Sequence, residues 1–187
     1  MIRAAVLALF ALLAVPTQAQ QPQMAGAFTL VAADGATVTE ATYRGRWQLI
    51  YFGYTFCPDA CPTALNEIGE ALDALGPLAA QVQPLFITID PRRDTRAVMG
   101  DYVKSFHPGI VGLTGQPAAT AAAARAYGVI YERQEDENGG PYLFEHSTFI
   151  AVIDPGGRLV TKLASDMPGD ALAHAVAALM DDRGGGN

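Results

Sequence analysis

Basic residues are scarce in this sequence, and their scarcity excludes one large class of partners. Only two lysines, Lys104 and Lys162, occur among the 187 residues, and the formal net charge is −7. Nucleic acid is bound through a basic face that neutralises phosphates, so this chain is not expected to bind it. Cysteine is also scarce, with two residues in all, and histidine occurs three times. A site made of thiols and imidazoles must therefore be built from these few residues.

The chain has no apolar run long enough to predict a transmembrane helix. Residues 4–15 form an uninterrupted apolar stretch of twelve, whereas a spanning helix needs about 20. The small residues Thr17 and Ala19 follow it, which is typical of a secretory signal cleaved after Ala19. We predict a signal peptide at residues 1–19, with an uncleaved membrane anchor as the alternative. The protein is then exported and periplasmic, either soluble or attached to the outer face of the cytoplasmic membrane through this segment alone.

The remaining sequence has the composition and length of one globular domain, which we place at residues 25–181. Half of the residues are hydrophobic and 17% are charged, and no internal repeat is visible. We predict that residues 182–187 are a disordered tail, and we take the protein to be a monomer.

Strand and helix signals alternate along this domain. A β-hairpin is predicted at residues 28–38, turning at Asp34-Gly35. Strands follow at residues 47–54, 82–89, 110–113 and 129–131, with helices at residues 62–75, 95–106 and 117–127 between them. Two strands at residues 147–153 and 159–163 and a helix at residues 170–180 close the chain.

A βαβ unit followed by a ββα unit is the skeleton of the thioredoxin fold. The predicted fold class is therefore α/β and thioredoxin-like, a central mixed sheet flanked by helices, with an added N-terminal β-hairpin. Between the two halves, residues 132–141 are acidic and rich in glycine, and we predict a mobile loop there.

The two cysteines, Cys57 and Cys61, lie between a predicted buried strand and a predicted helix. Three chemistries compete for them. A structural disulfide would close a loop of only five residues, which stabilises by roughly 2 kcal/mol. Thiol-disulfide exchange is favoured by a helix start, which lowers a thiol pKa, although the common redox motif has two intervening residues and here there are three. A peroxidase is disfavoured because no Arg or Gln is clearly placed to polarise a peroxide. Metal binding needs a third ligand.

Of the three histidines, His146 is the candidate for that third ligand. His107 follows a predicted helix and is assigned to capping it, and His174 lies off the apolar stripe of the last helix and is assigned to the surface. His146 stands at the entry to the strand that begins the ββα half. In a thioredoxin-like sheet this entry faces the cysteine loop. Two thiolates and one imidazole form a soft donor set that favours copper, Cu(I) in particular.

Several segments together resemble one known family. They are residues 51–62 (YFGYTFCPDACP), 87–95 (ITIDPRRDT), 111–115 (VGLTG), 126–129 (AYGV) and 145–147 (EHS). In this order the sequence resembles the Sco/SenC family over roughly residues 25–180.

The resemblance implies a copper chaperone that delivers copper to the binuclear copper site of cytochrome c oxidase during assembly. It implies Cys57, Cys61 and His146 as metal ligands, for Cu(I) and also Cu(II), and no enzymatic activity as the main role. The expected partners are the copper-site subunit of the oxidase and another copper carrier or a thiol reductase. The alternative is an extracytoplasmic thiol-disulfide oxidoreductase that uses the pair Cys57 and Cys61 to keep a partner's cysteines reduced.

Two acidic residues near the site have alternative interpretations. Asp90 either orients the site or an incoming partner, or it pairs with Arg92 or Arg93. Asp59 either adds negative charge around the metal or is a turn residue. The five methionines form no cluster, which argues against a methionine-based copper carrier.

Overall fold

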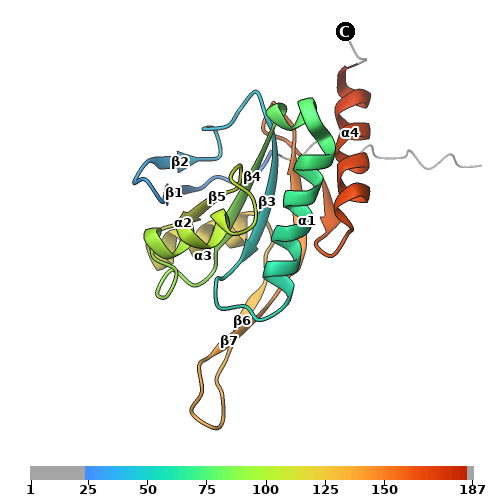
Figure 1. Ribbon diagram of the computed structural model, residues 1–187. Coiled ribbons are helices and arrows are strands. Elements are labelled where there is room, and N and C mark those ends of the chain that lie inside the picture. The colour runs from blue at the N-terminus through green and yellow to red at the C-terminus, as the bar shows by residue number, and fades with distance from the viewer. Residues whose placement is uncertain (1–23, 185–187) are drawn as a thin grey trace, which may run out of the picture.

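A computed structural model describes residues 24–184, with the side chains described up to Asp182 (Figure 1). The predicted signal segment and residues 185–187 of the predicted tail lie outside this range. Within it, no helix has the length and apolar character needed to cross a bilayer.

The described chain forms nine strands, four α-helices and one short 3₁₀ helix. The strands are β1 (Thr29–Ala32), β2 (Thr37–Thr39), β3 (Trp47–Gly53), β4 (Val82–Thr88), β5 (Val111–Thr114), β6 (Tyr131–Gln134), β7 (Leu143–His146), β8 (Phe149–Ile153) and β9 (Leu159–Ala164). The helices are α1 (Ala60–Leu75), η1 (Gly76–Gln81), α2 (Arg96–Lys104), α3 (Pro117–Ala126) and α4 (Gly169–Gly184).

Seven strands make one mixed sheet in the order β2-β1-β5-β4-β3-β8-β9. Strand β3 runs parallel to β4 and antiparallel to β8, so it lies in the interior of the sheet. All seven residues of β3 and all seven of β4 are buried, which accounts for their nearly continuous apolar sequences. The predicted α/β thioredoxin-like fold is confirmed. The leading hairpin extends the same sheet, because β1 pairs with β5.

Helices cover both faces of this sheet. Successive residues of a strand point to opposite faces, so Tyr51 and Phe52 mark the two sides. On the Tyr51 side, the Phe86 ring stacks on the Tyr51 ring at a centroid distance of 6.0 Å and also contacts Tyr102 of α2. Helices α1 and α4 pack against each other on this side (Figure 1). On the Phe52 side, the ring of Tyr127, which follows α3, packs against the Phe52 ring at a centroid distance of 5.5 Å.

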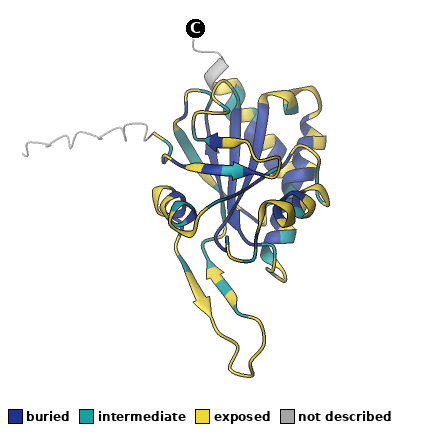
Figure 2. Cartoon of the chain, turned by 90° about the vertical axis from the view of Figure 1, so that its left-hand side faces the viewer, coloured by how far each residue is buried: buried dark blue, intermediate teal, exposed yellow. Residues whose placement is uncertain are grey.

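The structure corrects part of the predicted mobile loop at residues 132–141, because residues 132–134 belong to a second, two-stranded sheet, whereas residues 135–141 lie in the connection between its strands. Within residues 24–184, strand β6 pairs only with β7, in antiparallel register from Tyr131 opposite His146 to Gln134 opposite Leu143. The strand predicted at residues 129–131 thus begins later and lies outside the main sheet. We call residues 131–146 the arm. It projects from the body near the start of α1, and most of its residues are exposed (Figure 2).

Helix boundaries differ from the predictions by up to four residues, and two of the differences affect the site or the predicted tail. Helix α1 begins at Ala60, two residues before Pro62, so Cys61 belongs to its first turn. Helix α4 continues to Gly184, so residues 182–184, predicted as part of a disordered tail, are helical.

Candidate metal centre

The first thiol lies in the loop that joins β3 to α1. The backbone N–H of Cys57 donates to the carbonyl of Tyr54 over 3.3 Å, which closes a turn directly after the strand. The N–H of Cys61, in the first turn of α1, donates to the Cys57 sulfur over 3.4 Å. The free N–H groups at a helix start thus face the sulfur and stabilise a thiolate there.

The carboxylate of Asp94 connects the same loop to the end of β4 by hydrogen bonds. It accepts hydrogen bonds from the Thr55 amide over 3.1 Å, from the Thr55 hydroxyl over 2.6 Å and from the Thr88 hydroxyl over 2.6 Å. Asp94 is fully buried, and these three donors satisfy the carboxylate. The cysteine loop is therefore fixed to the end of β4.

The second thiol is buried against the sheet. Cys61 has no exposed surface, and the Tyr51 hydroxyl lies 3.9 Å from its sulfur. A side chain at Gly53 would place a Cβ atom 2.6 Å from that sulfur, closer than atoms can approach. Glycine at the end of β3 therefore leaves the space that the thiol occupies.

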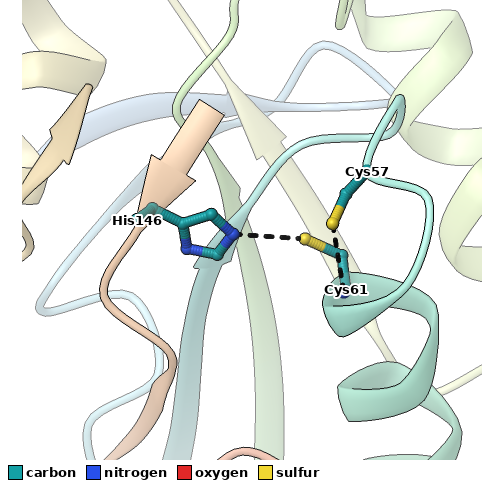
Figure 3. Close-up of side chains that lie close together, drawn as sticks. All are labelled: Cys57, Cys61 and His146. Atoms are coloured by element: carbon teal, nitrogen blue, oxygen red, sulfur yellow. Dashed lines mark hydrogen bonds between the residues drawn. The ribbon is translucent and has the colours of Figure 1, made fainter. Parts of the chain in front are cut away.

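The imidazole comes from the arm. His146 is the last residue of β7, and its Nδ1 lies 2.9 Å from the Ser147 carbonyl oxygen. A carbonyl can only accept, so Nδ1 carries the proton and the Nε2 lone pair is free to bind. Nε2 lies 3.6 Å from the Cys61 sulfur (Figure 3). A backbone carbonyl that fixes the tautomer in this way is a common support for metal-binding histidines.

The three side chains expected to bind metal are thus brought together by the fold. The two sulfurs and the imidazole nitrogen lie within 4.8 Å of one another, and no other such group of three His, Cys, Asp or Glu occurs in residues 24–182. Ligand atoms about 2.0–2.3 Å from a shared ion lie closer than this to each other, so small side-chain rotations suffice to bind one ion. The donor chemistry, two sulfurs and one imidazole, suits a soft ion such as Cu(I).

The two thiols differ in acidity. A hydrogen bond from the Cys61 thiol lowers the pKa of Cys57 to about 3, against the opposing effect of burial, and the backbone N–H groups of Asp59 and Cys61 contribute in the same direction. The pKa of Cys61 is raised, first by its hydrogen bond to the Cys57 sulfur and then by burial. At neutral pH the pair therefore carries one proton, on Cys61, and one negative charge, on Cys57.

A cleft of about 490 Å³ gives access to the site. Cys57 and residues 58–60 line one side of it, and the whole of β7 lines the other. Cys61 lies behind the cleft. Phe56, beside Cys57, is 52% exposed at the surface. The arm and the cysteine loop thus form two walls around one thiolate and one imidazole.

Arg93 attaches the arm to the body. Its guanidinium forms an ion pair with Asp90 and donates to the Tyr142 carbonyl over 2.9 Å. The same group stacks on the Tyr142 ring at 3.7 Å, and the Tyr142 hydroxyl donates to Asp90 over 3.1 Å. Of the partners considered for Asp90, the structure thus selects Arg93. Asp59 is exposed and forms no side-chain cap on α1, which fits its interpretation as a turn residue.

The other two histidines do not reach the cysteines. His107 follows α2, where its Nδ1 accepts a hydrogen bond from the Gly109 amide and its Nε2 lies 3.5 Å from Asp73. His174 is exposed on α4. Sequence reasoning missed Tyr54, whose hydroxyl contacts β7, and the stacking of Arg93 on Tyr142. An aromatic residue three positions before Cys57 was the available signal for the first.

Comparison with known proteins gives one consistent result. The family model described as SCO1/SenC matches residues 16–181. "Protein SCO1 homolog 1, mitochondrial" of Arabidopsis thaliana is 38% identical over 152 residues, which are 81% of this chain and 45% of that protein. "Protein SCO1 homolog, mitochondrial" of Homo sapiens is 35% identical over 162 residues, 86% of this chain and 54% of that protein. The chain spans about half the length of these two relatives.

Solved structures agree with the sequence comparison. Arabidopsis thaliana ScoI with copper bound has a TM-score of 0.79 and 36% identity, and the match covers 85% of this chain and 99% of that one. Yeast Sco1 with copper bound has a TM-score of 0.78 and 34% identity, covering 86% and 90%. BsSco, described with a disulfide switch and as a member of the Sco family of cytochrome c oxidase assembly proteins, shares the fold, with a TM-score of 0.68 at 15% identity over 89% and 96%.

Proposed function

This chain belongs to the SCO1/SenC family, and from this premise we propose that it is a copper metallochaperone whose ion is held by Cys57, Cys61 and His146. The observation that carries the proposal is the convergence of two sulfurs and an imidazole nitrogen within 4.8 Å. Copper in two similar solved structures, from Arabidopsis and yeast, supports the choice of metal. Copper is the cargo of the protein, and ligand exchange is its task.

We propose that the recipient is the binuclear copper site of cytochrome c oxidase and that the protein works outside the cytoplasmic membrane. The description of BsSco as an oxidase assembly protein supports the recipient. A bacterial relative, the SCO2-like protein of Rickettsia felis, is 38% identical over 145 residues, which fits an exported bacterial protein. The cleft supports the hand-off, because a partner's ligands can reach Cys57 and His146 before the buried Cys61 is displaced.

Copper titration of the reduced protein tests the three-ligand site. Wild type is expected to bind one copper ion per chain. Cys57→Ser and His146→Ala are each expected to lose at least tenfold in affinity, because the loss of a ligand exceeds the 10–100-fold effect of losing a supporting group. His174→Ala is the matched control, since this histidine is exposed on α4. Wild-type affinity in His146→Ala would exclude the imidazole as a ligand.

The unequal thiols favour a second candidate function, reduction of a partner disulfide. The Cys57 thiolate would attack one sulfur of that disulfide, forming a mixed disulfide and releasing the other sulfur as a thiolate. Cys61 would then lose its proton, attack Cys57 and release the second partner thiol. The partner gains two electrons, and Cys57 and Cys61 end as a disulfide.

This reductase activity is separable from copper transfer. It predicts reduction of a model disulfide that persists in His146→Ala, disappears in Cys57→Ser and does not depend on copper. Absence of any reduction by the wild-type protein would exclude it.

A further inference from the structure

The third candidate ligand sits on an element that the main sheet does not hold. In the described residues, β6 is the only strand that pairs with β7, and neither strand belongs to the seven-stranded sheet. Figure 3 shows His146 at the end of β7, facing the cysteines. Its position there therefore depends on the few contacts that fasten the arm to the body.

The Tyr54 hydroxyl makes the contact nearest to His146. It accepts a hydrogen bond from the Phe144 amide over 3.1 Å, and it lies 3.4 Å from the Phe144 carbonyl oxygen, to which it donates. Phe144 is two residues before His146, so both lie on the same side of the strand. One hydroxyl thus bonds to both backbone groups of Phe144, two residues before the candidate ligand.

The Tyr54 ring reinforces this contact. It meets the Phe144 ring edge to face at 5.4 Å and the His146 ring edge to face at 6.0 Å. Only 1% of Tyr54 is exposed, so its ring is fixed by packing. These edge-to-face contacts restrict both the position and the orientation of the imidazole ring.

The backbone of Tyr54 also contacts the cysteine loop, on the other side of the site. The Tyr54 carbonyl accepts the Cys57 amide over 3.3 Å, which closes the turn of the cysteine loop. Tyr54 is therefore bonded through its backbone to a thiol-bearing residue and through its side chain to the strand that bears the imidazole. Arg93, the other attachment of the arm, pairs with Asp90, donates to the Tyr142 carbonyl and lies over the Phe56 ring at 4.8 Å, but it has no hydrogen bond to β7.

We propose that Tyr54 is the positioning residue of the metal site, and that its hydroxyl fastens the arm so that His146 stays within reach of both sulfurs. The proposal rests on the proposed copper-binding function for its consequence, but the attachment itself is a property of the protein without metal. Loss of the hydroxyl frees β7 and moves His146 away from the thiols, while the thiols remain in place.

Tyr54→Phe tests this proposal, because it removes only the hydroxyl. In the reduced protein without metal, exchange of the Phe144 amide with solvent, measured by NMR, should become at least tenfold faster. Copper affinity should fall about tenfold, the usual effect of losing a group that orients a ligand. In the Cu(II) form, the nitrogen hyperfine signal of His146 should weaken.

Tyr131→Phe is the matched control. The ring of Tyr131 also contacts the Phe144 ring, at 5.8 Å, but its hydroxyl forms no hydrogen bond in the described residues.

A double variant separates positioning from direct ligation. If Tyr54 acts through His146, Tyr54→Phe should cause no further loss of copper affinity in a His146→Ala background. A tenfold loss that persists there would overturn the proposal, as would unchanged Phe144 exchange in the single variant. If wild type binds no copper, the proposed function fails, whereas Phe144 exchange in the metal-free protein still decides whether Tyr54 fastens the arm.

Discussion

At the residue scale, the two thiols acquire different properties although they lie four positions apart. Cys57 is partly exposed at the cleft and faces the N–H groups of the first turn of α1, whereas Cys61 is fully buried against Tyr51 and Gly53. The hydrogen bond between the thiols then favours one proton on Cys61 and a negative charge on Cys57. The pair presents one nucleophile to a partner or to a metal.

This asymmetry predicts an unusual pH dependence of thiol reactivity. The pKa of Cys57 is lowered to about 3, so alkylation of Cys57 in the reduced protein should vary little between about pH 5 and pH 8. In Cys61→Ala the hydrogen bond that contributes most to the lowering is lost, and the rate should fall as the pH is lowered across this range. Iodoacetamide labelling followed by mass spectrometry measures both rates. A wild-type rate that falls tenfold per pH unit would contradict a lowered pKa.

The same shift has a consequence for stability. An unfolded cysteine has a pKa of about 8.5, so the folded protein binds fewer protons at Cys57 than the unfolded chain does. The resulting stabilisation is complete above about pH 8.5 and decreases as the pH falls toward the folded pKa of about 3. Folding and thiolate formation at Cys57 therefore favour each other at neutral pH.

Residue type and position were sufficient to predict the three candidate ligands. Cys57, Cys61 and His146 could be grouped because a thioredoxin-like order of strands places their segments at one end of the sheet. Tyr54 could not be found in this way. Its hydroxyl bonds to backbone groups 90 positions away, and a bond to backbone leaves no mark on the residue types of the partner strand.

At the element scale, the arm shows why residues 132–141 were predicted to be a mobile loop. Their acidic composition provides little apolar surface for burial, and strand β6 is in fact mostly exposed. What orders the strand is pairing with β7, together with the rings of Tyr131 and Phe144 at 5.8 Å. Composition within one segment cannot reveal a partner strand that follows nine residues later.

Arg93 provides a test of how the arm is attached. Arg93→Lys should lower the free energy of unfolding by about 1–2 kcal/mol, because an ammonium group cannot both bond to Asp90 and Tyr142 and stack on the Tyr142 ring. Protease cleavage within residues 135–141 should also become faster. Urea denaturation and limited proteolysis measure the two effects. Arg92→Lys is the matched control, since Arg92 is exposed beside it; equal effects of the two substitutions would show that the guanidinium of Arg93 does not hold the arm.

At the scale of the whole molecule, the sheet was predictable and its extension was less so. Apolar runs and turn signals located β3, β4, β8 and β9, because these strands are buried or joined by a tight turn. The pairing of β1 with β5 joins segments about 80 residues apart, and no local pattern specifies such a partner. The core of the fold was therefore predictable from the sequence, whereas its edges depend on contacts between distant segments.

The candidate site joins distant parts of this molecule, since Cys61 and His146 are separated by 85 positions. An ion bound by both residues binds the folded protein more tightly than the unfolded chain, so it should stabilise the fold. Free Cu(I) at 100 times its dissociation constant adds at most about 2.7 kcal/mol, which for a domain of this size raises Tm by up to roughly 5–10 °C. Differential scanning fluorimetry of the reduced protein measures this shift. At the same copper concentration, His174→Ala should show the same Tm shift as wild type, and His146→Ala should show a clearly smaller one. Only His146→Ala removes the ligand that connects the arm to the helix bearing Cys61. Equal shifts in wild type and His146→Ala would mean that copper is held by the cysteine loop alone.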